Sequence, residues 1–198
     1  YDAKKHTVTV AQNGKSLVLP VKAMLARKPE RKASKSGDIA RVYVDKSGGS
    51  GRGDVHAVYS DGRDVKLTGG HNCSEAKVAS DRHTVGWVEF ELIPELEPDR
   101  GLPAPYSLVI WRDGKAMRTF GGRNMLAPGS DDHGCVHEWA FYNGASQVVM
   151  GRGPADRGTK WFELRSVATG KLLEQCDDPD YYGEGDSIPG WARTLRPR

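Results

Sequence analysis

The chain has 198 residues, of which 37% are hydrophobic and 28% charged, and its net charge at pH 7 is +3. It is too apolar to be disordered, and so small a net charge gives no general attraction to nucleic acid or to an anionic membrane. Its apolar runs are far shorter than the ~20 residues of a membrane helix, so we expect no membrane span.

Six β-hairpins are predicted along the chain, each from strand-forming residues on both sides of a short turn. The turns contain Gly, Asn or Asp, which adopt the positive φ angles of tight hairpins most readily. Few long helical patterns separate them, so an all-β fold is expected. In chain order the hairpins cover residues 9–19, 55–68, 79–88, 108–120, 136–150 and 162–176.

The hairpins alternate between two kinds, which reveals an internal repeat. Hairpins of the first kind align on Asn13, Asp81 and Asn143, and each is followed by a hairpin with a turn of the Asp-Gly-Lys type. Two successive hairpins make a four-stranded antiparallel sheet, the blade of a β-propeller. We therefore predict a single domain, residues 1–198, with three repeated four-stranded units at about 7–68, 73–120 and 135–176 and a C-terminal tail at 177–198.

The turns at Ser80-Asp81 and Thr169-Gly170-Lys171 resemble those of TolB-type and WD-repeat-like propeller blades in bacterial exported proteins, including proteins of uncharacterised function. The resemblance covers most of residues 7–176. It departs from the pattern at Arg82, where the turn favours Gly. It implies a propeller-type fold and an extracytoplasmic location, periplasmic or secreted. A chain that begins at Tyr1 rather than Met is compatible with processing during export.

Three blades leave a physical problem. Closed propellers have about 4–8 blades, and an open set leaves sheet edges and faces exposed. A homodimer would complete a ring from two sets of three blades, or the tails of the chain would cover the open sides. A layered sandwich of the same hairpins is the alternative architecture.

Two segments have a strongly biased charge. Residues 22–36 contain six basic residues and one acidic residue, whereas residues 177–186 contain five acidic residues and no basic one. The basic segment is interpreted as a solvated loop or as an anion-binding arm. The acidic tail is interpreted as a segment that docks on it, with Tyr181, Tyr182 and Trp191 as apolar anchors.

The repeat also aligns two His-x-Cys triplets, His71-Asn72-Cys73 and His133-Gly134-Cys135, each of which ends eight residues before the aligned turn residue. In a propeller such positions lie near the mouth of the central channel, which would bring the triplets together. Asp131, Asp132 and His137 lie next to the second triplet in the sequence.

Three interpretations of the triplets stay open. A Cys73–Cys135 disulfide, or two inert buried thiols, would be purely structural. A tetrahedral zinc ion would take thiolate and imidazole ligands, here from His71, Cys73, His133, Cys135 and His137. A hydrolase would need a cysteine nucleophile, a histidine that takes its proton and an aspartate that orients the histidine. The candidate catalytic residues are then His71, Cys73, Asp131, Asp132, His133 and Cys135.

Established catalytic signatures are absent from the sequence. It contains no Gly-x-Ser-x-Gly elbow, no His-Glu-x-x-His zinc-protease motif and no Gly-x-x-x-x-Gly-Lys-Ser/Thr phosphate loop. We therefore expect a non-catalytic, propeller-type binding or scaffolding module of an exported bacterial protein. The alternative is a small hydrolase that acts on ester or phosphoester substrates through the His/Cys/Asp cluster, with zinc as the metal that could assist it.

Overall fold

The structure is a computed structural model that divides by its backbone packing into two units, residues 1–36 and residues 37–198, and each is described by itself. The basic segment 22–36 lies outside the described residues. The single domain over residues 1–198 stays a prediction. The structure describes residues 7–12, 15–20, 37–46, 51–69, 72–91, 104–121, 134–155, 157–182 and 188–196.

The first unit contains an antiparallel hairpin of β1 (Thr7–Gln12) and β2 (Lys15–Pro20), which forms a two-stranded sheet. The strands pair from Thr7↔Pro20 to Gln12↔Lys15. This confirms the predicted hairpin at residues 9–19.

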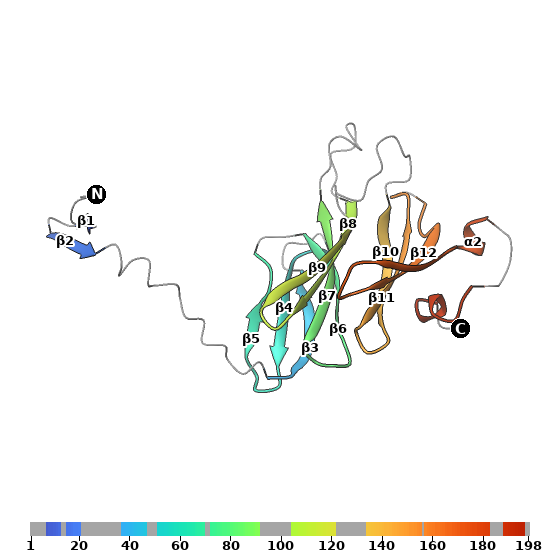
Figure 1. Cartoon of the computed structure of the whole chain (residues 1–198), viewed down its shortest axis with the longest axis horizontal. Helices are drawn as coiled ribbons and strands as arrows, with labels where there is room; N and C mark the ends of the chain where they lie inside the picture. Colours follow the sequence, from blue (N-terminus) through green and yellow to red (C-terminus); the bar gives the residue numbers. More distant parts are fainter. Residues whose placement is uncertain are drawn as a thin grey trace. The chain divides into compact units, whose positions relative to one another are not determined.

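The second unit is built from three antiparallel sheets that follow one another along the chain (Figure 1). The first sheet is β3 (Ile39–Asp45), β4 (Asp54–Tyr59) and β5 (Asp64–Lys66). The second is β6 (Cys73–Val78), β7 (Thr84–Glu91), β8 (Ala104–Arg112) and β9 (Lys115–Gly121). The third is β10 (Cys135–Tyr142), β11 (Gln147–Gly153), β12 (Trp161–Ser166) and β13 (Leu172–Asp177).

The fold class is the predicted one: an all-β chain of repeated antiparallel, blade-like sheets, consistent with a partial β-propeller. The second and third sheets have four strands in chain order, as each predicted unit requires. The first sheet differs. The hairpin 9–19 forms a sheet of its own, and the first sheet begins instead at β3, a strand that the sequence analysis did not predict.

The predicted turns have the backbone that their residues favour. Asp113 and Gly114 have φ angles of 50° and 91° and form a two-residue turn between the paired residues Arg112 and Lys115. Positive φ at both central positions is the geometry that matches the twist of a hairpin. Arg82 also has a positive φ, 56°, at the position where the repeat favours Gly.

Two hydrophobic cores lie between successive sheets. The core between the first and second sheets includes Val55, Tyr59, Trp87 and Trp111. The core between the second and third sheets is built around Trp139. The members of this second core are Val88, Leu108, Ile110, Phe120, Val136, Trp139, Val148, Met150 and Val167. Since each sheet contributes alternate residues to these cores, the sheets stack face to face.

Trp139 of β10 fastens the third sheet to the second. Its indole Nε1–H donates to the carbonyl of Glu75 at 3.1 Å, beside an irregularity in β6 where Glu75 has a φ of 50°. Lys77 donates to the carbonyl of Trp139 and lies over its ring. The ring fits because Gly86 has no side chain: a Cβ there would be 2.6 Å from Trp139 Cη2.

The chain ends with α2 (Pro179–Tyr182) and the short 3₁₀ helix η2 (Ala192–Thr194). Residues 188–196, called the C-terminal segment below, pack on the third sheet through Trp191 and Ala192. Trp191 is therefore an apolar anchor on this sheet. The docking of the acidic tail on the basic segment stays a prediction. Among the described residues, no helix is long and apolar enough to cross a membrane.

Candidate functional site

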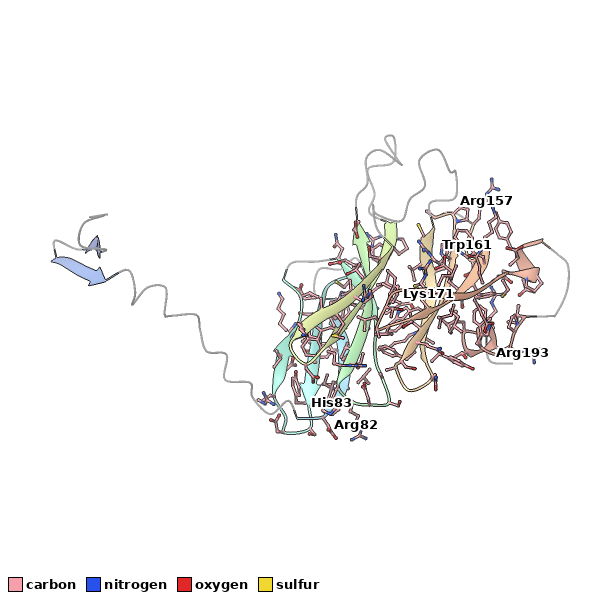
Figure 2. All side chains as sticks on the ribbon, in the orientation of Figure 1. Arg82, His83, Arg157, Trp161, Lys171 and Arg193 are labelled. Atoms are coloured by element: carbon pink, nitrogen blue, oxygen red, sulfur yellow. The ribbon has the colours of Figure 1, made fainter. Side chains whose placement is uncertain are left out.

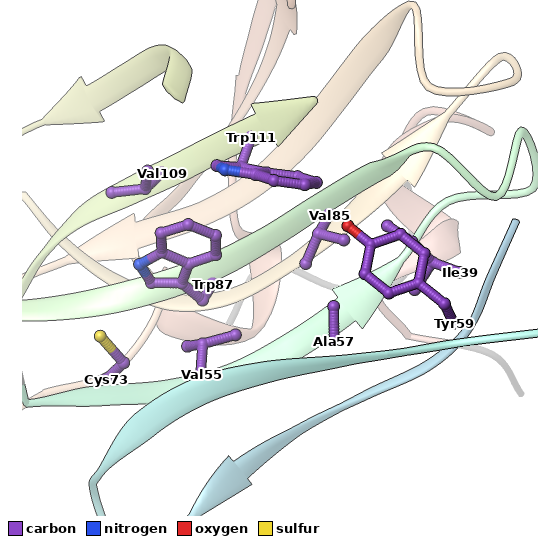
Figure 3. Packing of buried hydrophobic residues seen from close by; sticks show 9 residues of the cluster. All are labelled: Ile39, Val55, Ala57, Tyr59, Cys73, Val85, Trp87, Val109 and Trp111. Carbon is purple, nitrogen blue, oxygen red and sulfur yellow. The ribbon is translucent and has the colours of Figure 1, made fainter. Parts of the chain in front are cut away.

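Cys73 begins β6 and lies in the core between the first and second sheets, with no exposed surface. Figure 3 shows its thiol beside Val55 and Trp87, with Val109 and Trp111 on the other side of the indole ring. The backbone of Cys73 pairs with Gly53 in both directions, by hydrogen bonds of 3.1 and 3.0 Å. This position joins the two sheets and gives Cys73 a structural role.

The surroundings of Cys73 keep its thiol protonated. The pKa of Cys73 is raised to about 12, first by burial and then by the carboxylates of Glu89 and Asp54, although a hydrogen bond with Thr68 lowers it. A nucleophilic cysteine needs the opposite, an electropositive and partly exposed site that lowers the thiol pKa. In the described structure Cys73 is a core thiol.

Cys135 occupies the equivalent place at the start of β10 and is also fully buried. No disulfide joins Cys73, Cys135 or Cys176, so the Cys73–Cys135 disulfide is not formed. This leaves two inert buried thiols as the structural interpretation that matches the described cysteines.

Of the three predicted site histidines, His137 lies in the described part of the structure. Its Nε2 lies 2.9 Å from the carbonyl oxygen of Pro154, and because a carbonyl only accepts, this nitrogen carries the hydrogen and donates it. Nε2 in that state has no lone pair for a metal ion. Among the residues that the structure describes, no group of three His, Cys, Asp or Glu side chains is placed to hold a metal.

The other predicted site residues, His71, Asp131, Asp132 and His133, lie outside the described residues. The catalytic and zinc arrangements that need them stay predictions.

A buried ion pair lies where β10 begins. Arg152 of β11 donates through Nε and Nη2 to the carbonyl of Gly134, at 2.9 and 2.5 Å, and its Nη1 lies 3.5 Å from the carboxylate of Glu163. Burial alone would raise the pKa of Glu163, but Arg152, with Arg165 and Trp161, outweighs it and lowers that pKa. Gly134 has a φ of 53°, and a Cβ there would meet Arg152 at 2.6 Å. The pair therefore fixes the backbone directly before Cys135.

A second polar cluster, which the sequence analysis missed, lies on the first sheet. Asp64 accepts hydrogen bonds from Tyr43 Oη at 2.7 Å and His56 Nδ1 at 3.0 Å. The rings of Tyr43 and His56 stack with their centroids 5.1 Å apart. The bonds from Tyr43 and then His56 lower the pKa of Asp64. The cluster holds the imidazole of His56 in the tautomer protonated at Nδ1.

A third cluster, also missed, joins the C-terminal segment to the third sheet. Arg196 donates to Asp178 through Nη1 at 3.2 Å and Nη2 at 2.6 Å, and also donates to Asp180. Trp191 Nε1 donates to Glu174 Oε2 at 2.6 Å. The sequence signal was present: an acidic stretch without a basic residue, followed by Trp191 and three arginines.

No family model matches the chain, and no curated protein matches it. A β-propeller domain of Cps50 (Swd1) from Myceliophteria thermophila is 11% identical, with a TM-score of 0.38, over 87% of this chain and 53% of that structure. The periplasmic gluconolactonase PpgL of Pseudomonas aeruginosa is 13% identical, with a TM-score of 0.36, over 88% of this chain and 51% of that structure. The chain thus spans about half the length of both structures. Similarity of this degree says nothing about what the chain binds or does.

Proposed function

We propose that the chain is a non-catalytic binding or scaffolding module made of propeller-type blades. One observation carries this proposal: Cys73, one of the two candidate nucleophiles, is fully buried, and its pKa is raised to about 12. A thiol in that state is almost entirely protonated at neutral pH and is shielded from substrate. The packing around Cys73 therefore disfavours the exposed thiolate that a cysteine hydrolase needs as its nucleophile.

The polar clusters of the described surface support a binding role. Asp64, held by its two partners, and Arg196, held by the buried Asp178, are partly exposed polar side chains in fixed orientations on sheets whose cores are already packed. Rigid sheets that carry partly exposed polar groups are suited to recognition. The extracytoplasmic location is part of the same proposal, as a prediction.

An activity screen tests the proposal. The wild-type chain is compared with Cys73→Ala and Cys135→Ala on chromogenic esters and phosphoesters, with Cys176→Ala as the matched control, and circular dichroism confirms that each variant is folded. We expect no hydrolysis above the buffer rate in any of them. Hydrolysis by the wild type that a folded Cys73→Ala or Cys135→Ala variant loses, while Cys176→Ala keeps it, would overturn the proposal in favour of the hydrolase.

A further inference from the structure

The third sheet has an apolar face on both of its sides. Val148 and Met150 of β11 point into the core with the second sheet, whereas Val149, between them, belongs to a third core on the opposite face. Phe162 and Leu164 of β12 complete this outer face. Apolar residues on both faces are expected of a sheet that is covered on both faces.

The cover on the outer face is the C-terminal segment, which contributes no strand. Trp191 and Ala192 are buried against the outer face, and Ile188 and Leu195 pack beside them. Its only regular structure in the described part of the chain is η2, a single 3₁₀ turn. The segment is therefore held by its side chains, as a bound peptide is held, and not by a ladder of backbone hydrogen bonds.

Two polar anchors fix the position of the segment, and they lie five residues apart. The indole of Trp191 donates to Glu174 of β13, and the guanidinium of Arg196 donates with two nitrogens to the two oxygens of Asp178. The Arg196 guanidinium also lies over the ring of Phe162, 5.4 Å from its centroid. A planar fork that bonds a carboxylate twice and stacks on an aromatic ring is a role for arginine and not for lysine.

The anchor for Arg196 is a built site. The side chain of Asp178 is only 1% exposed, and its Oδ1 also accepts the backbone N–H of Asp180. A buried carboxylate that loses its cation keeps the full cost of desolvation, so this position selects for a guanidinium from whatever segment covers the face.

We propose that the outer face of the third sheet is a peptide-docking surface, which the C-terminal segment of this chain occupies in the described structure. Its partner is a polypeptide segment that carries a tryptophan followed five residues later by an arginine. The tryptophan fills the place over Phe162 and Leu164 and bonds Glu174, and the arginine bonds Asp178. The inference rests on the proposed function in that it names the binding surface and the partner class of the module.

A binding measurement with the 198-residue chain tests the inference. The probe is a fluorescent synthetic peptide with the sequence of residues 188–196, and the receptor is the full chain with Trp191→Ala and Arg196→Ala, which releases its own segment. Fluorescence anisotropy should show saturable binding to this variant. Binding to the wild type should be at least tenfold weaker, because its own segment competes, and a peptide with alanine in place of the arginine should also bind at least tenfold more weakly.

Two further variants keep the inference falsifiable. Adding Asp178→Asn to the double variant should abolish binding, because the carboxylate that pairs with the arginine is lost. If the double variant does not fold, Arg196→Lys is used alone, because it keeps the charge but weakens the two-nitrogen contact with Asp178. This variant should bind the peptide more tightly than the wild type. Its Cys176, which packs under the segment, should also be alkylated faster. A folded released variant that does not bind, or binding that survives Asp178→Asn, would overturn the inference. Neither result bears on the ester screen, which alone decides the proposed absence of catalysis.

Discussion

At the scale of single residues, Gly86 shows how the packing of two sheets depends on a missing side chain. A Cβ at Gly86 would lie 2.6 Å from Trp139 Cη2 and 2.9 Å from Ile110 Cδ1, inside the core between the second and third sheets. We predict that Gly86→Ala lowers the free energy of unfolding by ~1–3 kcal/mol, the usual cost of overpacking. Gly69→Ala is the control, because a Cβ there meets nothing within 4 Å. Urea unfolding measures both, and an equal effect of the two substitutions would contradict the packing described here.

Asp81 gives a residue-scale prediction that depends on pH. Its carboxylate accepts the backbone N–H groups of His83 and Thr84 and the hydroxyl of Thr84, and Arg112 lies beside it. Burial alone would raise the pKa of Asp81, but these hydrogen bonds and the charge of Arg112 outweigh it and lower the pKa below its usual 3.8. A carboxyl whose pKa is lowered by folding stabilises the protein above the unfolded pKa, and this contribution is lost as the pH falls through the folded value.

We therefore predict that Asp81→Ala costs about 1–2 kcal/mol at pH 7 and clearly less near pH 3. Urea unfolding at both pH values measures the difference between variant and wild type. Asp81→Asn cannot titrate and should show the same dependence on pH. A cost that stays constant between the two pH values would contradict the assignment.

Cys73 shows how far residue-scale prediction from the sequence could go. The repeat correctly places Cys73 and Cys135 at equivalent strand starts. The sequence could not show that Cys73 would be buried, because the residues that cover it, Val55 and Trp87, come from a different hairpin and a different strand. The type of a residue indicates its possible chemistry, but its protonation state depends on these distant neighbours.

At the scale of elements, the turns of the hairpins follow from their residues and allow a test. Arg82 and Gly114 both have a positive φ, 56° and 91°. The left-handed conformation costs a residue with a Cβ ~1–2 kcal/mol, and glycine avoids this cost but loses ~0.5–1 kcal/mol of chain entropy on folding.

We predict that Arg82→Gly leaves the stability unchanged or raises it by up to ~1 kcal/mol, whereas Gly114→Ala lowers it by ~1 kcal/mol or more. Thermal unfolding followed by circular dichroism compares the two substitutions with the wild type. A clear loss of stability in Arg82→Gly would show that the weak, exposed contact of Arg82 with Asp38, at 3.8 Å, matters more than the backbone.

The first sheet marks the limit of prediction at the element scale. All six hairpins are present, because their turns and alternating residues are local signals. The strand β3 also has a local signal, the β-branched and aromatic run Val42-Tyr43-Val44, but the repeat assigned its place to the hairpin 9–19. Strand order in a sheet depends on contacts between segments that are distant in the sequence. The repeat pattern alone therefore could not decide whether the hairpin 9–19 or β3 begins the first sheet.

At the scale of the whole molecule, the two outer faces of the three-sheet unit differ. The outer face of the third sheet is covered by the C-terminal segment, while charged side chains such as Arg41, Asp64 and Lys66 are exposed on the first sheet. Figure 2 shows side chains such as Arg157, Lys171 and Arg193 on the third sheet and the segments that follow its strands. A dimer that closed a ring through these faces would have to displace the segment and bury those charges.

We predict that the wild-type chain is a monomer in light scattering coupled to size-exclusion chromatography at micromolar concentration. The variant with Trp191→Ala and Arg196→Ala provides the comparison, because it uncovers the apolar face of the third sheet. A stable wild-type dimer would show that the ring proposed from the repeat forms in spite of these faces.

The central claim is that this is a binding module whose cysteines belong to its cores. The most direct test is the rate at which iodoacetamide alkylates each cysteine in the native protein, with the modified residues identified by mass spectrometry. We predict that Cys73 and Cys135 react at least ~100-fold more slowly in the native chain than in the chain unfolded in urea, since both are fully buried. Alkylation of either cysteine in the native protein at the rate of a free thiol would contradict the burial of these thiols and favour the alternative, a cysteine hydrolase.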